Sequence, residues 1–200
     1  MKPIILASVS PIRAQLLQNA GLDVEIIPAE VDESELKRVL FSQARQTKAD
    51  DLAELLAEAK ALDVSQKNPG RLVIGADQTL GCGEVLYDKA LDMKDVRQKL
   101  LALRGNTHAL FSAVACAKDG NIIWRYVDAA HLTMRDFSPE FLGKYLALVG
   151  EDVLTSVGGY KLEAQGSQLF EKIKGDYFTI LGLPLLPLLE FLRKSGVLEK

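Results

Sequence analysis

The chain of 200 residues has few cysteines and few histidines. Its two cysteines, Cys82 and Cys116, lie far apart and form no CxxC pair, and neither His108 nor His131 has a cysteine near it in the sequence. This pattern excludes a disulfide framework and argues against a zinc site. It is typical of a protein of the reducing cytosol, so we expect a cytoplasmic location.

The chain also lacks a strong charge of one sign and a long apolar run. Its net charge is −3 and its pI is near 5.5, which argues against a surface adapted throughout to nucleic acid or to an acidic membrane. The apolar start is too short for a signal sequence, and two prolines, a glycine and a glutamate interrupt the most apolar stretch, residues 180–192. We therefore expect a soluble protein with no membrane span and no nucleic-acid partner.

Strand-like and helix-like segments alternate along the chain and predict one α/β domain over residues 1–200 with a mixed sheet. Strands are expected at residues 4–7, 24–27, 72–74, 107–117, 122–134, 169–173 and 177–180. Helices are expected from Pro11, within 35–62, from the N-cap Asp92 to Leu103, and at 140–149 and 184–194. Asp119-Gly120 is a hairpin signal between the two long strands. A cleft between two lobes is compatible with this pattern but does not follow from it.

The first thirteen residues favour an anion-binding junction between a strand and a helix. The apolar strand is followed by Ser8 and Ser10, then by Pro11 at the first helical position and by Arg13 one turn later. Ser10 is the expected N-cap. Free N–H groups at the helix start, two hydroxyls and a guanidinium suit a phosphate. Most such junctions bind nothing, so a purely structural turn remains the alternative.

Acidic residues follow two further expected strands. Asp32 and Glu33 come after the second strand, and Asp77 comes after the apolar strand 72–74. Ligand sites of α/β sheets gather at the carboxyl ends of strands, and two carboxylates there can share a divalent cation such as Mg²⁺, which often bridges a protein to phosphates. The structural alternative is that Asp77 only caps a turn.

Arg13, Lys60 and Lys89 are the candidates to neutralise the remaining phosphate charge. A surface lysine is usually only a solvated charge, so this alternative stays open for both lysines. The two histidines are expected to be packing or surface residues. From the residues alone we expect an α/β enzyme that handles a metal ion and a phosphate.

The same residues carry a resemblance to the Maf family of nucleoside triphosphate pyrophosphatases that spans nearly the whole chain. The matching motifs, in chain order, are residues 5–11 with Arg13, Val31-Asp32-Glu33, Ala59-Lys60-Ala61, Ile74-Gly75-Ala76-Asp77-Gln78, Lys89, and a tail with Gly158-Gly159-Tyr160, Glu163, Phe170, Gly175-Asp176-Tyr177 and Gly182-Leu183-Pro184. One such motif would be a weak signal, whereas six in order are a specific one.

The resemblance implies a Maf/ITPase-like fold, with an elongated mixed sheet flanked by helices and a cleft between two lobes. It implies that water cleaves a nucleoside triphosphate into the monophosphate and pyrophosphate with the help of Mg²⁺ or Mn²⁺, as house-cleaning of non-standard nucleotides. The implied catalytic residues are Asp77, Glu33, Lys60 and Lys89, of which Asp77 and Glu33 also hold the metal. The implied substrate-binding residues are Ser8, Ser10, Arg13, Gln78 and Glu163.

Departures from the family pattern bear on the nucleobase. Ile12 stands where many members have arginine, Gln78 replaces threonine, Asn106 follows Gly105, and Glu163 stands where the pyrimidine branch has glutamine. Together they resemble the branch that acts on 7-methyl-GTP more than the branch that acts on dTTP and UTP. Guanine presents two adjacent donors, which a carboxylate can accept together, whereas uracil and thymine present one donor between acceptors.

Two other functions stay open at this point. The missing arginine at Ile12 is compatible with a nucleotide-binding regulator of septum formation or cell division that has little turnover. A phosphatase that removes single phosphates is the second alternative. Family members often look dimeric, so the resemblance is compatible with a homodimer, although the sequence does not determine the oligomeric state.

Overall fold

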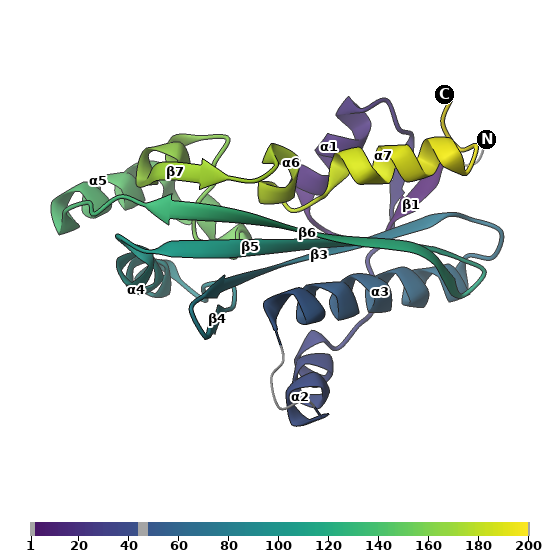
Figure 1. The fold of residues 1–200 in the computed structure, drawn as a ribbon, viewed down its shortest axis with the longest axis horizontal. Helices are drawn as coiled ribbons and strands as arrows, with labels where there is room; N and C mark the ends of the chain where they lie inside the picture. Colours follow the sequence, from purple (N-terminus) through teal and green to yellow (C-terminus); the bar gives the residue numbers. More distant parts are fainter. Residues whose placement is uncertain (1–2, 44–47, 200) are drawn as a thin grey trace.

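The computed structural model describes residues 3–43 and 48–199, which form a mixed seven-stranded sheet with helices on both faces (Figure 1). The strands are β1 (Ile4–Leu6), β2 (Val24–Ile26), β3 (Val73–Cys82), β4 (Val85–Tyr87), β5 (Thr107–Lys118), β6 (Asn121–Met134) and β7 (Phe170–Lys174). Their order is β2-β1-β3-β5-β6-β7, and β4 pairs with β3 off this path. β1 is parallel to β2 and β3, whereas the other pairs are antiparallel. The mixed α/β sheet is confirmed.

The helices cover the sheet in two layers (Figure 1). They are α1 (Pro11–Asn19), α2 (Glu33–Gln43), α3 (Ala49–Lys67), α4 (Met93–Leu103), α5 (Pro139–Val149), α6 (Tyr177–Ile180) and α7 (Leu185–Lys194), with 3₁₀ turns at Gly150–Thr155 and Gln165–Leu169. The long helix α3 runs along one face, and α1 and α7 lie on the other. No helix in the described ranges is long and apolar enough to cross a membrane.

Two large hydrophobic clusters occupy the two ends of the elongated sheet (Figure 1). One is built around α4 and α5, with Leu100, Leu142 and Met134 at its centre. The other joins β1, α1 and α7 through Leu6, Leu17 and Leu188. Two cores on one continuous sheet correspond to the two expected lobes.

The sheet has a gap beside the middle of β3. β1 pairs with β3 only at Val73 and Ile74, and β4 pairs with it only from Leu80 onward. Between these points, residues 75–79 of β3 have a strand partner on the β5 side alone within the described chain. β1 ends there, and Arg13 of α1 donates to the carbonyl of Ala76 within this stretch.

Three sequence-based predictions need correction. Asp77 does not follow a strand end: β3 continues to Cys82 because β5 pairs with it as far as Gly81. The helix-forming stretch 35–62 contains two helices, α2 and α3, and part of it (44–47) lies outside the described residues. Residues 177–180 form the short helix α6 rather than a strand, because the Asp176 carboxylate caps the N–H groups of Phe178 and Thr179.

His108 is a packing residue of the core, one of the two alternatives expected for the histidines. Its ring is 1% exposed, and Nε2 shares a hydrogen bond of 2.7 Å with the hydroxyl of Tyr160. Burial lowers the pKa of His108 to about 4, because the charged imidazolium would be desolvated. The residue is therefore neutral at pH 7 and serves packing.

Candidate active site

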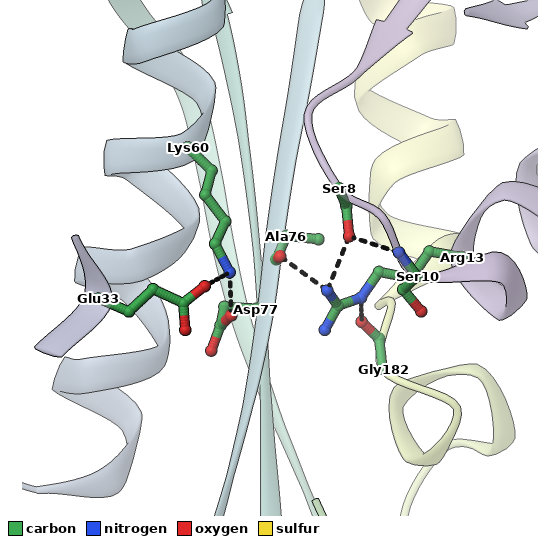
Figure 2. Close-up of polar contacts among 8 residues, drawn as sticks. All are labelled: Ser8, Ser10, Arg13, Glu33, Lys60, Ala76, Asp77 and Gly182. Carbon is green, nitrogen blue, oxygen red and sulfur yellow. Dashed lines mark hydrogen bonds and ion pairs between the residues drawn. The ribbon is translucent and has the colours of Figure 1, made fainter. Parts of the chain in front are cut away.

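A lysine bridges two carboxylates on the α3 face of the sheet (Figure 2). Lys60 Nζ on α3 lies 2.6 Å from Asp77 Oδ1 on β3 and 2.7 Å from Glu33 Oε1 at the start of α2. The Lys60 and Asp77 side chains are only 13% and 12% exposed, whereas Glu33 is half exposed. Three separate elements thus bring together three of the four residues that the sequence implicated in catalysis, and Lys89 is the one outside this cluster.

The close contact between α3 and β3 depends on Gly75. A Cβ atom at this position would lie 2.2 Å from the carbonyl oxygen of Ala57 and 2.6 Å from the amide nitrogen of Ala61. Ala57 and Ala61 are themselves small and buried, and Lys60 lies between them in α3. The small residues let the helix backbone lie directly on the strand, which places Lys60 within bonding distance of Asp77.

The β1–α1 junction lies on the other side of β3 and has the expected form (Figure 2). Ser10 is the N-cap of α1 and Pro11 is its first residue, although the Ser10 hydroxyl makes no capping bond. Ser8 Oγ instead accepts hydrogen bonds from Ser10 N at 3.3 Å and from Arg13 Nη1 at 3.1 Å. Since both lone pairs of this hydroxyl are used, its proton is left to be donated to a ligand.

Arg13 is a buried residue that joins three parts of the chain. Its Nη1 donates to the carbonyl of Ala76 at 2.8 Å, and its Nε donates to the carbonyl of Gly182 at 2.8 Å. Burial lowers the pKa of Arg13, while the negative charges of Asp77 and Glu33 raise it. The guanidinium therefore has a large structural role, and Nη2 is the nitrogen that remains for a phosphate.

The two groups of residues lie on either side of β3 next to the gap in the sheet (Figure 2). Successive residues of a strand point to opposite faces. Asp77 accordingly faces Lys60 on α3, and Gln78 faces α6. An anion at the gap would lie between the Ser8 and Arg13 donors and the Asp77, Lys60 and Glu33 cluster.

Gln78 is fixed by its own amide nitrogen. Nε2 donates to Ser112 Oγ, to the carbonyl of Thr179 and to the carbonyl of Ile180, at 2.9 to 3.1 Å. These three acceptors identify this atom as the amide nitrogen rather than the oxygen, and they use both of its protons. Only the side-chain oxygen of Gln78 is left to meet a substrate, and it can only accept.

Lys89 is exposed in the connection between β4 and α4, and within the described residues its ammonium group has no partner. Tyr87 at the end of β4 pairs with Leu80, three residues beyond Asp77 on β3. Asp88 forms an ion pair of 2.5 Å with Lys37 of α2, the helix that begins with Glu33. The connection that carries Lys89 is thus joined through Asp88 to the helix that carries Glu33.

Glu163 and Ile12 line the same pocket, which has a volume of about 570 Å³. Its walls come from α1, α6 and α7 and are mostly apolar, with Tyr177, Phe178 and Leu181 among them. Asn106, by contrast, donates to the carbonyls of Ala102 and Arg104 at the end of α4. Its side chain closes that helix, and Asn106 is not among the residues that line this pocket.

Glu33 and Asp77 form a sparse donor set for a metal ion. Nowhere in the described residues do three or more His, Cys, Asp or Glu side chains gather in a way that could hold a metal. Mg²⁺ commonly uses only one or two carboxylates and takes its other ligands from water and substrate phosphates. The two carboxylates that share Lys60 fit this pattern, and Asp77 Oδ2 makes no hydrogen bond to the described chain.

Sequence reasoning missed two charged residues near the site. One is Asp88, which joins α2 to the Lys89 connection. The other is Lys99 on α4, which is 6% exposed and donates to the carbonyls of Asp88 and Val157. No local pattern marks either residue, because both act through partners that are distant in the sequence.

Known proteins are similar to this chain over nearly its whole length. The family model described as Maf-like protein matches residues 3–195. A 7-methyl-GTP pyrophosphatase of Mesorhizobium japonicum is 54% identical over 98% of both chains. A nucleoside triphosphate pyrophosphatase of Paramagnetospirillum magneticum is 50% identical over 97% of this chain and 99% of its own.

A solved nucleoside-triphosphatase / dITP/XTP pyrophosphatase from Mycobacterium abscessus covers 99% of this chain and 98% of its own, with 14% identity and a TM-score of 0.42. Similarity at this level carries no argument about the site. The family match and the two relatives are sufficient: the chain belongs to the Maf-like protein family.

Proposed function

We propose that the protein hydrolyses a nucleoside triphosphate between its α- and β-phosphates, giving the monophosphate and pyrophosphate. The observation that carries this proposal is the Asp77–Lys60–Glu33 cluster beside the Ser8 and Arg13 junction, across one gap in the sheet. Both named relatives carry pyrophosphatase names. The biological role that follows is removal of non-standard nucleotides.

Each residue has a role that its geometry supports. Asp77 Oδ2 accepts the proton of the attacking water, while Lys60 holds the other oxygen of this carboxylate in place. The Ser8 hydroxyl, Arg13 Nη2 and the first N–H groups of α1 donate to the phosphates. Lys60 and Lys89 neutralise the charge that remains.

Glu33 and Asp77 are the residues that would hold a divalent cation. When bound, Mg²⁺ or Mn²⁺ would supply charge neutralisation on the phosphate oxygens. Phosphoryl transfer needs mainly positioning and such neutralisation, so no covalent intermediate with the protein is required.

We further propose a guanine-type nucleobase, including 7-methylguanine. Glu163 lines the pocket beside α1 together with mostly apolar residues, and Ile12 adds no positive charge to the same pocket. An arginine at this position could pair with Glu163 and compete for its oxygens. The Gln78 oxygen is likewise an acceptor, which suits the donors of guanine better than the acceptors of uracil.

A nucleotide panel tests the function directly. Purified protein with Mg²⁺ or Mn²⁺ is incubated with 7-methyl-GTP, GTP, UTP and dTTP in parallel, and pyrophosphate release is followed. We expect 7-methyl-GTP to be cleaved with the highest kcat/KM. Release of orthophosphate and diphosphate would instead indicate a phosphatase, and no release from any triphosphate would refute the proposal.

Glu163→Gln tests the base preference. We expect the kcat/KM ratio of 7-methyl-GTP to UTP to fall at least about tenfold, because a carboxylate that accepts two donors is replaced by an amide. The control is Gln165→Glu, which exchanges the same two residue types in the opposite direction at an exposed position two residues away. An unchanged ratio in Glu163→Gln would show that this side chain does not contact the base.

A regulator of septum formation with little turnover is not favoured by any observation in the structure. The missing arginine at Ile12 is the sequence feature that is compatible with such a regulator. Because Ile12 lines the proposed base pocket, its replacement of arginine fits a difference in nucleobase preference.

A further inference from the structure

Lys99 is a buried cation that the proposed reaction does not use. It lies on the inner side of α4, is 6% exposed, and makes no ion pair with the described residues. Its ammonium group donates to two backbone carbonyls, those of Asp88 and, at 3.2 Å, Val157. Burial lowers the pKa of Lys99, against the opposing influence of Asp95 and Asp88. A charge is costly to bury, so these two bonds must compensate for lost hydration.

The two carbonyls belong to connections that are far apart in the sequence. Asp88 directly precedes Lys89 in the connection between β4 and α4. Val157 lies in the connection that continues through Tyr160 to Glu163. One ammonium group therefore joins the segment that carries a proposed phosphate ligand to the segment that carries the proposed base ligand.

Neighbouring contacts extend this link in both directions. The Asp88 carboxylate binds Lys37 on α2, whose first residue is Glu33. On the other side, Gly159 packs so closely on Val96 of α4 that a Cβ there would lie 3.1 Å from the valine side chain. An apolar side chain of similar length could fill the same space, but it could not donate to either carbonyl.

We infer that Lys99 is a positioning residue whose buried ammonium group holds the connections bearing Lys89 and Glu163 in one arrangement, an inference that rests on the proposed function. It sets where the phosphate end and the base end of the nucleotide are bound relative to each other. Lys99 itself touches no reacting atom.

The test compares Lys99→Met with Lys94→Met, an exposed lysine of the same helix. For Lys99→Met we expect kcat/KM for 7-methyl-GTP to fall about 10- to 100-fold, mainly through KM, because both ends of the substrate lose their fixed positions. Lys94→Met should keep the wild-type value. Lys99→Gln keeps an uncharged NH₂ donor group on a shorter side chain, so its kcat/KM should fall between those of the other two variants. It serves as the test if Lys99→Met does not fold.

A double variant separates positioning from a general loss of stability. If Lys99 acts by placing Lys89, the loss in Lys99→Met/Lys89→Met is smaller than the product of the two single losses. Losses that multiply, or a wild-type KM in Lys99→Met, would overturn the inference.

Amide hydrogen exchange gives a readout that does not need activity. Residues 87–91 and 157–163 should exchange faster in Lys99→Met and at the wild-type rate in Lys94→Met. Unchanged exchange in either connection of Lys99→Met overturns the inference, whatever the activity. A wild-type protein that cleaves no triphosphate refutes the proposed function instead, and the exchange result then still decides whether Lys99 holds the two connections.

Discussion

Asp77→Asn is expected to lower kcat about 100- to 10,000-fold while leaving the fold and nucleotide binding close to wild type. The amide keeps an oxygen that can accept from Lys60, so the bond of 2.6 Å between α3 and β3 can persist. It cannot take the proton of the attacking water. The measurements are pyrophosphate release at saturating substrate and nucleotide binding by calorimetry.

The matched control is Asp136→Asn, which makes the same chemical change at an exposed carboxylate paired with Arg104. This variant should keep wild-type kcat. If Asp77→Asn retained more than about a tenth of the wild-type kcat, Asp77 would not be the proton acceptor, and Glu33 would be the next carboxylate to test.

Gly75→Ala is expected to cost about 3 kcal/mol or more of unfolding free energy. The new methyl group would lie 2.2 Å from the Ala57 carbonyl and 2.9 Å from Ala61 Cβ, and the helix backbone cannot rotate away as a flexible side chain could. Helix α3 must shift, which also moves Lys60 away from Asp77. We therefore expect both a lower urea midpoint of unfolding and a lower kcat.

Gly81→Ala is the control on the same strand. A Cβ there has its nearest neighbour at 3.6 Å, an ordinary contact distance, so the change should alter stability by less than about 1 kcal/mol. Equal urea midpoints for the two variants would show that α3 does not need close contact with β3.

Local patterns predicted the elements whose cause is local. Ser10-Pro11 marked the start of α1, and Asp119-Gly120 marked the turn of the long hairpin, because capping, proline geometry and turn preferences act over a few residues. The strand predicted for residues 177–180 was wrong. The composition Tyr-Phe-Thr-Ile favours a strand, but Asp176 caps these residues as a helix, and the carbonyl of Thr179 accepts from Gln78.

The extent of β3 could not be predicted from its own residues. After Ile74 the sequence turns to glycine, alanine and polar residues, which favours a strand end, yet pairing with β5 carries the strand on to Cys82. Asp77 consequently belongs to the middle of a strand, where its neighbours on the chain point to the opposite face.

The residue types of the site can be recognised in the sequence: paired carboxylates, lysines, a serine-rich helix start and an arginine, in the order of the Maf-like family. The contacts among these residues depend on the packing of helices and strands. Packing binds Lys60 to both Glu33 and Asp77, lets two nitrogens of Arg13 hold the carbonyls of Ala76 and Gly182, and buries Lys99 between two connections. Hydrogen bonds and ion pairs require distances of about 3 Å, and between remote residues such distances arise only when helices and strands pack together.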